Sequence, residues 1–147
     1  MRSNRPPTGA DVVRAFTTVE LLVVMAIIAI LAGVGYPSYV RYIARGNRAA
    51  AESFMLEVSS RQERYLVDAR QYAPDIPTLS MAVPTSVSSS YTVTITGVTA
   101  TPPAYTIQAV PLGPQATNDS GCGSLTLTSA GVKGASGASG PITCWNR

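Results

Sequence analysis

Residues 16–37 read FTTVELLVVMAIIAILAGVGYP, and this stretch decides the fold. From Leu21 to Tyr36 it carries no charged residue, and residues 16–19 extend it to the ~20 residues that a helix needs to cross a bilayer. One carboxylate, Glu20, lies inside it. Because an ionised carboxylate costs roughly 2.5–3.5 kcal/mol in the hydrocarbon core, we expect Glu20 to have a partner there. The alternative is that Glu20 lies at the level of the lipid headgroups.

The first fifteen residues, MRSNRPPTGADVVRA, are polar and rich in arginine. They lack apolar periodicity and are predicted to form a leader without regular structure. Their positive charge predicts a cytoplasmic N-terminus. In an ordinary secretory signal the small residue follows the apolar core, whereas here Ala15 precedes it. Cleavage between Ala15 and Phe16 would therefore remove the leader and keep the membrane helix.

The stretch from Ala15 to Val24, AFTTVELLVV, resembles the processing site of type IV prepilins, and the resemblance extends through YPSY at residues 36–39. Ala15 stands where that family usually has glycine. The resemblance implies cleavage by prepilin peptidase between Ala15 and Phe16 and N-methylation of Phe16. It also implies that Glu20 attracts the N-terminal amine of a neighbouring subunit during assembly, a pairing that would offset the cost of burying the carboxylate.

Beyond Pro37 the periodicity predicts an amphipathic helix to about Arg70, with one stripe directed at a folded head. The stripe is Ala51, Phe54, Met55, Val58, Gln62, Tyr65 and Leu66. The helix is weakened at Gly33, Gly35 and Pro37. This segment either bends on assembly or forms a simple kink at the membrane boundary. Arg41, Arg45 and Arg48 form a basic face that could contact lipid phosphates, acids of an adjacent subunit or DNA, although a solvated face is the commonest explanation.

The C-terminal half predicts a small antiparallel sheet. Residues 73–90 indicate a surface loop, and strands are expected at 91–96, 105–110 and 125–128, with a turn at 97–103 and a loop at 131–140. Cys122 and Cys144 favour a disulfide in an oxidising compartment, with two free buried thiols as the alternative. The region around these cysteines and the ending Cys144-Trp145 resemble the disulfide-bounded region of short type IVa pilins, and most of all a subgroup of minor pilins.

The predicted fold class is α+β: a long N-terminal helix, membrane-spanning in its first half, packs against a small antiparallel sheet with a C-terminal disulfide-bounded loop. The expected divisions are a leader removed on processing (1–15), a transmembrane and filament-core helix (16–37), an amphipathic continuation (38–72) and a globular head (73–147).

No constellation for catalysis is apparent. Histidine is absent from the sequence, and no serine or acid has an evident catalytic partner. Asn118, Asp119 and Ser120 supply a single carboxylate, so a turn is favoured over a calcium site. We expect no enzymatic activity, no cofactor and no bound metal.

The resemblance implies a structural subunit of a type IV pilus, a minor one by its subgroup, with roles in adhesion, twitching motility and DNA uptake. Its implied partners are other pilin subunits, prepilin peptidase, the inner-membrane assembly platform and membrane lipid. The precursor would cross the inner membrane once, with its head in the periplasm, before assembly into a surface pilus. The alternatives are a DNA-binding competence pilin, a type II secretion pseudopilin and, more distantly, a membrane-anchored enzyme.

Overall fold

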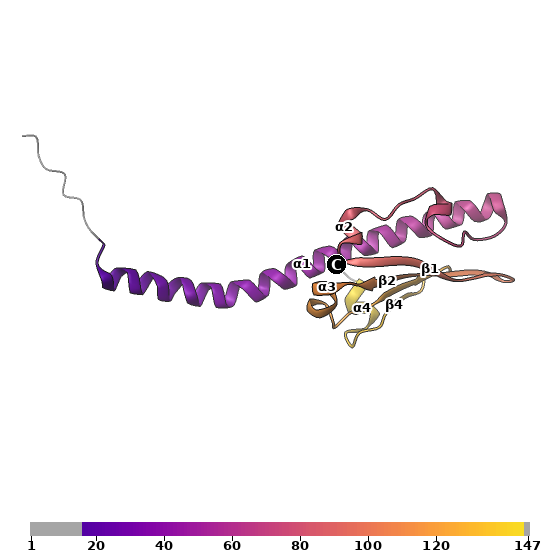
Figure 1. The fold of residues 1–147 in the computed structure, drawn as a ribbon. Coiled ribbons are helices and arrows are strands. Elements are labelled where there is room, and N and C mark those ends of the chain that lie inside the picture. Colours follow the sequence, from indigo (N-terminus) through magenta and orange to yellow (C-terminus); the bar gives the residue numbers. More distant parts are fainter. Residues whose placement is uncertain (1–15, 146–147) are drawn as a thin grey trace, which may run out of the picture. The chain divides into compact units, whose positions relative to one another are not determined.

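The computed structural model describes residues 16–145, so Ala15 and the leader lie outside the described part of the chain. The chain divides at Pro37 into two compact units, residues 1–37 and 38–147. Helix α1, Thr18–Ala69, begins in the first unit and ends in the second (Figure 1). The prediction that the helix reaches about Arg70 is therefore confirmed.

The first unit contributes the apolar part of α1. Its large apolar side chains are exposed, with Phe16 74% and Ile30 68% accessible. By length and composition α1 is the one helix in the described residues able to cross a membrane, with a mean hydropathy of 2.4 over its most apolar window. Pro37 lies inside α1, although proline cannot donate the backbone hydrogen bond of that turn.

The second unit packs the rest of α1 against a four-stranded antiparallel sheet. The strands are β1 (Tyr91–Ala100), β2 (Pro103–Pro111), β3 (Leu125–Thr128) and β4 (Lys133–Ala135), paired in the order β1-β2-β3-β4. Short helices lie in the connections, namely η1 (Pro77–Leu79), α2 (Thr85–Ser88) and α3 (Gly113–Asn118), and a further short helix, α4 (Gly140–Trp145), follows β4. In Figure 1 the second half of α1 runs along the sheet, and α3 and α4 lie toward the same end of it.

Strand register sets the core. Ile95 lies opposite Ile107, and Ile107 lies opposite Leu127, so one face of the sheet presents aligned apolar side chains. Since side chains alternate between faces along a strand, the threonines between them point away. Val58 and Met55 from α1 join this core and are fully buried, which confirms the predicted helical stripe.

The sequence predicts three or four antiparallel strands, and the four-stranded sheet agrees with this, but two of its segments differ from the prediction. Residues 131–140, expected to be a loop, contain β4, which pairs with β3 in spite of its short and glycine-containing sequence. β1 continues through Gly97 to Ala100, where a turn was expected. A register shift between Thr96 and Thr99 lets the β1–β2 hairpin extend past the buried part of the sheet. Both segments are specified by a pairing partner, which local propensity does not reveal.

Candidate functional site

Glu20 lies in the first turn of α1, where its backbone N–H donates to the Thr17 hydroxyl oxygen at 3.2 Å. Thr17 therefore caps the helix, and Thr17-Thr18-Val19-Glu20 has the S/T-x-x-E spacing of a capping box. That signal is legible in the sequence. A carboxylate at this position also interacts favourably with the helix dipole.

The apolar surface that follows Glu20 has no partner within the described chain. Its exposed large side chains between residues 21 and 31 are Leu21, Leu22, Val23, Val24, Met25, Ile27, Ile28, Ile30 and Leu31. A contiguous apolar surface of this extent marks a membrane or protein interface. This helix surface is the candidate site of anchoring and assembly.

Arg48 is directed into the head rather than onto a solvated basic face, which corrects the sequence prediction for this residue. Its guanidinium forms an ion pair with Asp119, lies 3.6 Å from the Glu52 carboxylate, and donates to the Cys122 sulfur at 3.2 Å. Glu52 is only 5% exposed. Arg48 therefore ties α1 to the turn that leads into the disulfide.

Gln115 and Tyr91 complete this polar cluster. The Gln115 amide donates to the Ala44 carbonyl at 2.9 Å and to the Tyr91 hydroxyl at 3.0 Å, and accepts from Asn47 at 3.1 Å. The Tyr91 hydroxyl donates to Asp119 at 3.2 Å. Burial, reinforced by the Asp119 carboxylate, raises the pKa of Tyr91 above its ordinary value of about 10. Tyr91 thus remains a neutral donor at any physiological pH.

The carboxylate oxygens of Asp119 accept hydrogen bonds from protein side chains. Asp119 lies in the turn predicted for residues 118–120, and each of its two carboxylate oxygens already accepts from the protein. Within the described residues, 16–145, no group of three or more His, Cys, Asp or Glu is placed to hold a metal ion. The role of this cluster is to join elements of the head.

The predicted disulfide is confirmed. Cys122 and Cys144 are bonded, which joins the turn before β3 to α4. The adjoining Trp145 is 8% exposed, donates from its indole N–H to the Gly134 carbonyl at 2.9 Å, and carries the Lys133 ammonium 5.1 Å from its ring centre. Gly137 allows the two segments to approach, since a Cβ there would lie 2.2 Å from the Gly121 carbonyl oxygen.

A second polar cluster closes the opposite end of the helix-sheet interface. The Tyr105 hydroxyl is hydrogen-bonded to Ser59 at 2.9 Å, and the Tyr72 hydroxyl donates to Glu63 at 3.2 Å. The two tyrosine rings meet edge to face, with centres 4.5 Å apart. Burial, with the Glu63 charge as a further cause, raises the pKa of both hydroxyls. These groups hold α1 to β2 and to the segment that follows α1.

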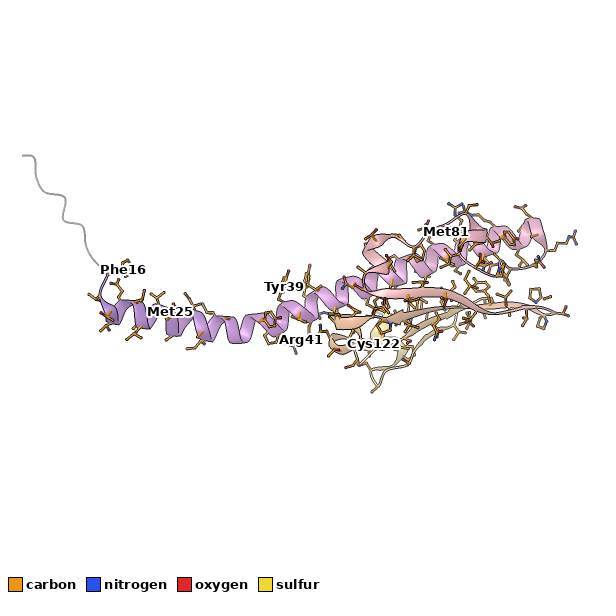
Figure 2. All side chains as sticks on the ribbon, viewed as in Figure 1. Phe16, Met25, Tyr39, Arg41, Met81 and Cys122 are labelled. Atoms are coloured by element: carbon orange, nitrogen blue, oxygen red, sulfur yellow. A yellow bond between two sulfur atoms is a disulfide. The ribbon has the colours of Figure 1, made fainter. Side chains whose placement is uncertain are left out.

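Arg41 and Arg45 remain on the surface. They line a groove of about 560 Å³ between α1 and the disulfide region, together with Arg48, Asp119, Ser139 and Thr143. Figure 2 shows Arg41 and Tyr39 on opposite sides of α1. Arg41 and Arg45 are thus the members of the predicted basic face that are available to an external ligand.

A helix with an unpartnered apolar first segment, packed further on against a four-stranded antiparallel sheet with a C-terminal disulfide, defines the type IV pilin class. The model of the family described as "Type IV minor pilin ComP, DNA uptake sequence receptor" matches residues 37–126, more than half of the chain. The chain belongs to this family, whose members are structural pilins.

A solved structure of a type IV pilin from Shewanella oneidensis is similar to the chain, at 23% sequence identity and a TM-score of 0.48. The match covers 61% of this chain and 89% of that one. No curated protein matches the sequence.

Proposed function

We propose that the protein is a minor subunit of a type IV pilus, stored in the inner membrane as a precursor and assembled through its N-terminal helix. Residues 1–15 form the leader, 16–37 the span and filament core, 38–72 the amphipathic continuation, and 73–147 the head. The proposal rests above all on the family match at residues 37–126, joined to the exposed apolar surface of α1 just before it. The chain crosses the inner membrane once, with the N-terminus in the cytoplasm and the head in the periplasm.

Processing is the first step. Prepilin peptidase cleaves between Ala15 and Phe16, and Phe16 is then N-methylated. This yields an ammonium group four residues before Glu20 in the mature chain, near the capped start of α1. In the filament the ammonium of one subunit pairs with Glu20 of a neighbour, and this pairing offsets the desolvation of both charges. The inner-membrane assembly platform transfers the subunit from lipid to filament, and the filament serves adhesion and twitching motility.

Glu20→Gln tests this assembly role. The variant should enter the membrane normally, since it removes a charge from an apolar segment. It should leave the ammonium of the incoming neighbour unpaired, and its content in sheared pili should fall about tenfold or more. Quantitative immunoblots of membrane and pilus fractions provide the measurement.

Glu57→Gln is the matched control, because it makes the same chemical change at an exposed position of the same helix. It should be incorporated normally. Equal incorporation of Glu20→Gln and the parent chain would refute the assembly role of Glu20.

DNA binding is the second candidate function, and the observation that favours it is the description of the matching family as a DNA uptake sequence receptor. Past α1, the described basic residues are Arg70, just before the head, and Lys133, and both are exposed. Lys133 lies over Trp145 beside the disulfide, which makes it the better-ordered of the two as a phosphate contact.

A mobility-shift assay tests this second function. The detergent-solubilised full chain should bind duplex DNA that carries the uptake sequence more tightly than a shuffled duplex. Lys133→Gln should weaken binding to both duplexes alike and reduce the salt slope by about 1, because one phosphate contact is lost. Val132→Thr, at an exposed neighbouring position, serves as the control. Equal affinity of the parent for the two duplexes would count against a receptor function.

A further inference from the structure

Arg41 and Arg45 project from one face of α1, four residues apart, into the groove beside the disulfide. Within residues 16–145 neither guanidinium lies at ion-pair distance from a carboxylate, since the two ion pairs found there both belong to Arg48. Arg48 and Asp119 compensate each other in the groove. Arg41 and Arg45 therefore give the groove an excess of positive charge that the head does not neutralise.

The distance along the chain limits what can reach this charge. Arg41 follows Pro37, the end of the proposed span, by four residues of the continuous helix α1, and a rise of about 1.5 Å per residue places it about 6 Å further along the helix axis. The headgroup region of a bilayer adds about 5–7 Å on each side of the hydrocarbon core. In the membrane-stored precursor, lipid phosphates are thus the anions that are always within reach.

The surroundings of the two arginines match a membrane interface. Tyr39 and Tyr42 are exposed, at 64% and 68%, on the same segment of α1, and tyrosine is enriched at the headgroup level of membranes. Ile142, next to the groove residue Thr143 on α4, is 80% exposed. Leu112 is 40% exposed and lines a neighbouring groove with Tyr39. Exposed aromatic and aliphatic side chains therefore surround the segment of α1 that carries the two arginines, with Tyr39 on the side of α1 opposite Arg41 (Figure 2).

From these observations we infer that the groove formed by Arg41, Arg45, Ser139 and Thr143 binds the phosphate of an anionic phospholipid in the periplasmic leaflet while the pilin is stored in the membrane. Arginine suits this ligand because its planar fork donates two hydrogen bonds to one phosphate, and the hydroxyls of Ser139 and Thr143 are further donors. The bound headgroup would hold the base of the head at the membrane surface until the subunit is extracted. This inference rests on the proposed membrane storage of the precursor.

Native mass spectrometry of the detergent-solubilised full chain, titrated with phosphatidylglycerol or phosphatidylcholine, tests the inference. The parent should retain phosphatidylglycerol in preference to phosphatidylcholine. The double variant R41Q/R45Q should lose about tenfold or more of its affinity for phosphatidylglycerol. R61Q/R64Q is the matched control, because it removes two charges from exposed positions of the same helix outside this groove, and its affinity should change less than about twofold. Circular dichroism verifies that both variants are folded.

Several outcomes would overturn the inference. One is an unchanged affinity of R41Q/R45Q for phosphatidylglycerol. Another is an equal loss of this affinity in R61Q/R64Q, which would reveal non-specific charge attraction. Loss of duplex DNA binding by R41Q/R45Q with lipid binding intact would assign the arginines to DNA instead.

Membrane insertion and incorporation into pili are measured on the same variants. Normal lipid selectivity in a chain that fails to enter pili would refute the proposed function alone. A parent chain that inserts and assembles but shows no lipid selectivity would refute this inference alone.

Discussion

Gln62 shows at the scale of one residue how the head is held together. It is fully buried in the apolar stripe of α1, where its amide N–H donates to the Ala73 carbonyl and its amide oxygen accepts from the Ala73 N–H, each at 2.8 Å. The two bonds satisfy both backbone groups of Ala73. They hold the chain in place just after α1 ends, where Arg70 adopts a left-handed conformation with φ of 56°.

We predict that Gln62→Ala destabilises the head by about 2–3 kcal/mol, because it leaves the buried N–H and C=O of Ala73 without partners. Urea denaturation followed by Trp145 fluorescence measures the change. Gln71→Ala, at an exposed glutamine, should shift the free energy of unfolding by less than about 0.5 kcal/mol. If the two variants are equally stable, the hydrogen bonds to Ala73 contribute nothing.

Other residues show the limit of sequence reasoning at this scale. The periodicity of α1 predicts that Gln62 lies in the buried stripe, but it does not predict which groups the Gln62 amide is hydrogen-bonded to. By sequence, Arg48 shares a basic face with Arg41 and Arg45, for which solvation is the commonest explanation, whereas its partner Asp119 lies 71 positions away. Long-range ion pairs leave no local pattern, so only the folded chain separates the structural arginine from the two exposed ones.

At the scale of elements, the disulfide matters most for β4 and α4, because these short elements bury few side chains. β4 has three residues, none of them fully buried, and α4 has six. The strand, the helix and the bond between Cys122 and Cys144 support one another through Trp145, which donates to the Gly134 carbonyl. Without the bond, these elements would depend on short pairings alone.

We predict that C122A/C144A lowers the free energy of unfolding by about 3 kcal/mol, the loop-closure value for cysteines separated by 22 positions. The emission of Trp145, the single tryptophan in the sequence, should also shift to longer wavelength as α4 loosens. Ser120→Ala, at an exposed position close to Cys122, is the control and should retain the parent stability. An unchanged denaturation midpoint in the double variant would show that the bond is dispensable.

At the scale of the whole molecule, the two units depend on different surroundings. Among the residues whose burial the structure describes, every buried apolar side chain lies at Ala44 or later, beyond the first unit. The apolar side chains of the first unit are exposed, and they need lipid or other subunits around them. The head can therefore be separated from its span without loss of core packing.

We predict that a chain beginning at Ser38, secreted into an oxidising compartment, is monomeric and soluble without detergent and unfolds cooperatively in urea. The full chain should require detergent, because its span exposes a continuous apolar surface. Light scattering and denaturation curves measure both properties. Aggregation of the Ser38 chain, or a gradual transition, would mean that the first unit supports the head.

The sequence by itself determined the elements that have a local signature. The apolar span with Glu20 is legible because membrane insertion depends on consecutive residues, and the α1 stripe and the alternation of β1 and β2 follow from helix and strand periods. Tertiary structure alone decided the formation of β4, the ion pair of Arg48 with Asp119 and the hydrogen bonds of Gln62 with Ala73. In each of these the stabilising partner is distant in the chain or is a backbone group, and such partners come together only when the head folds.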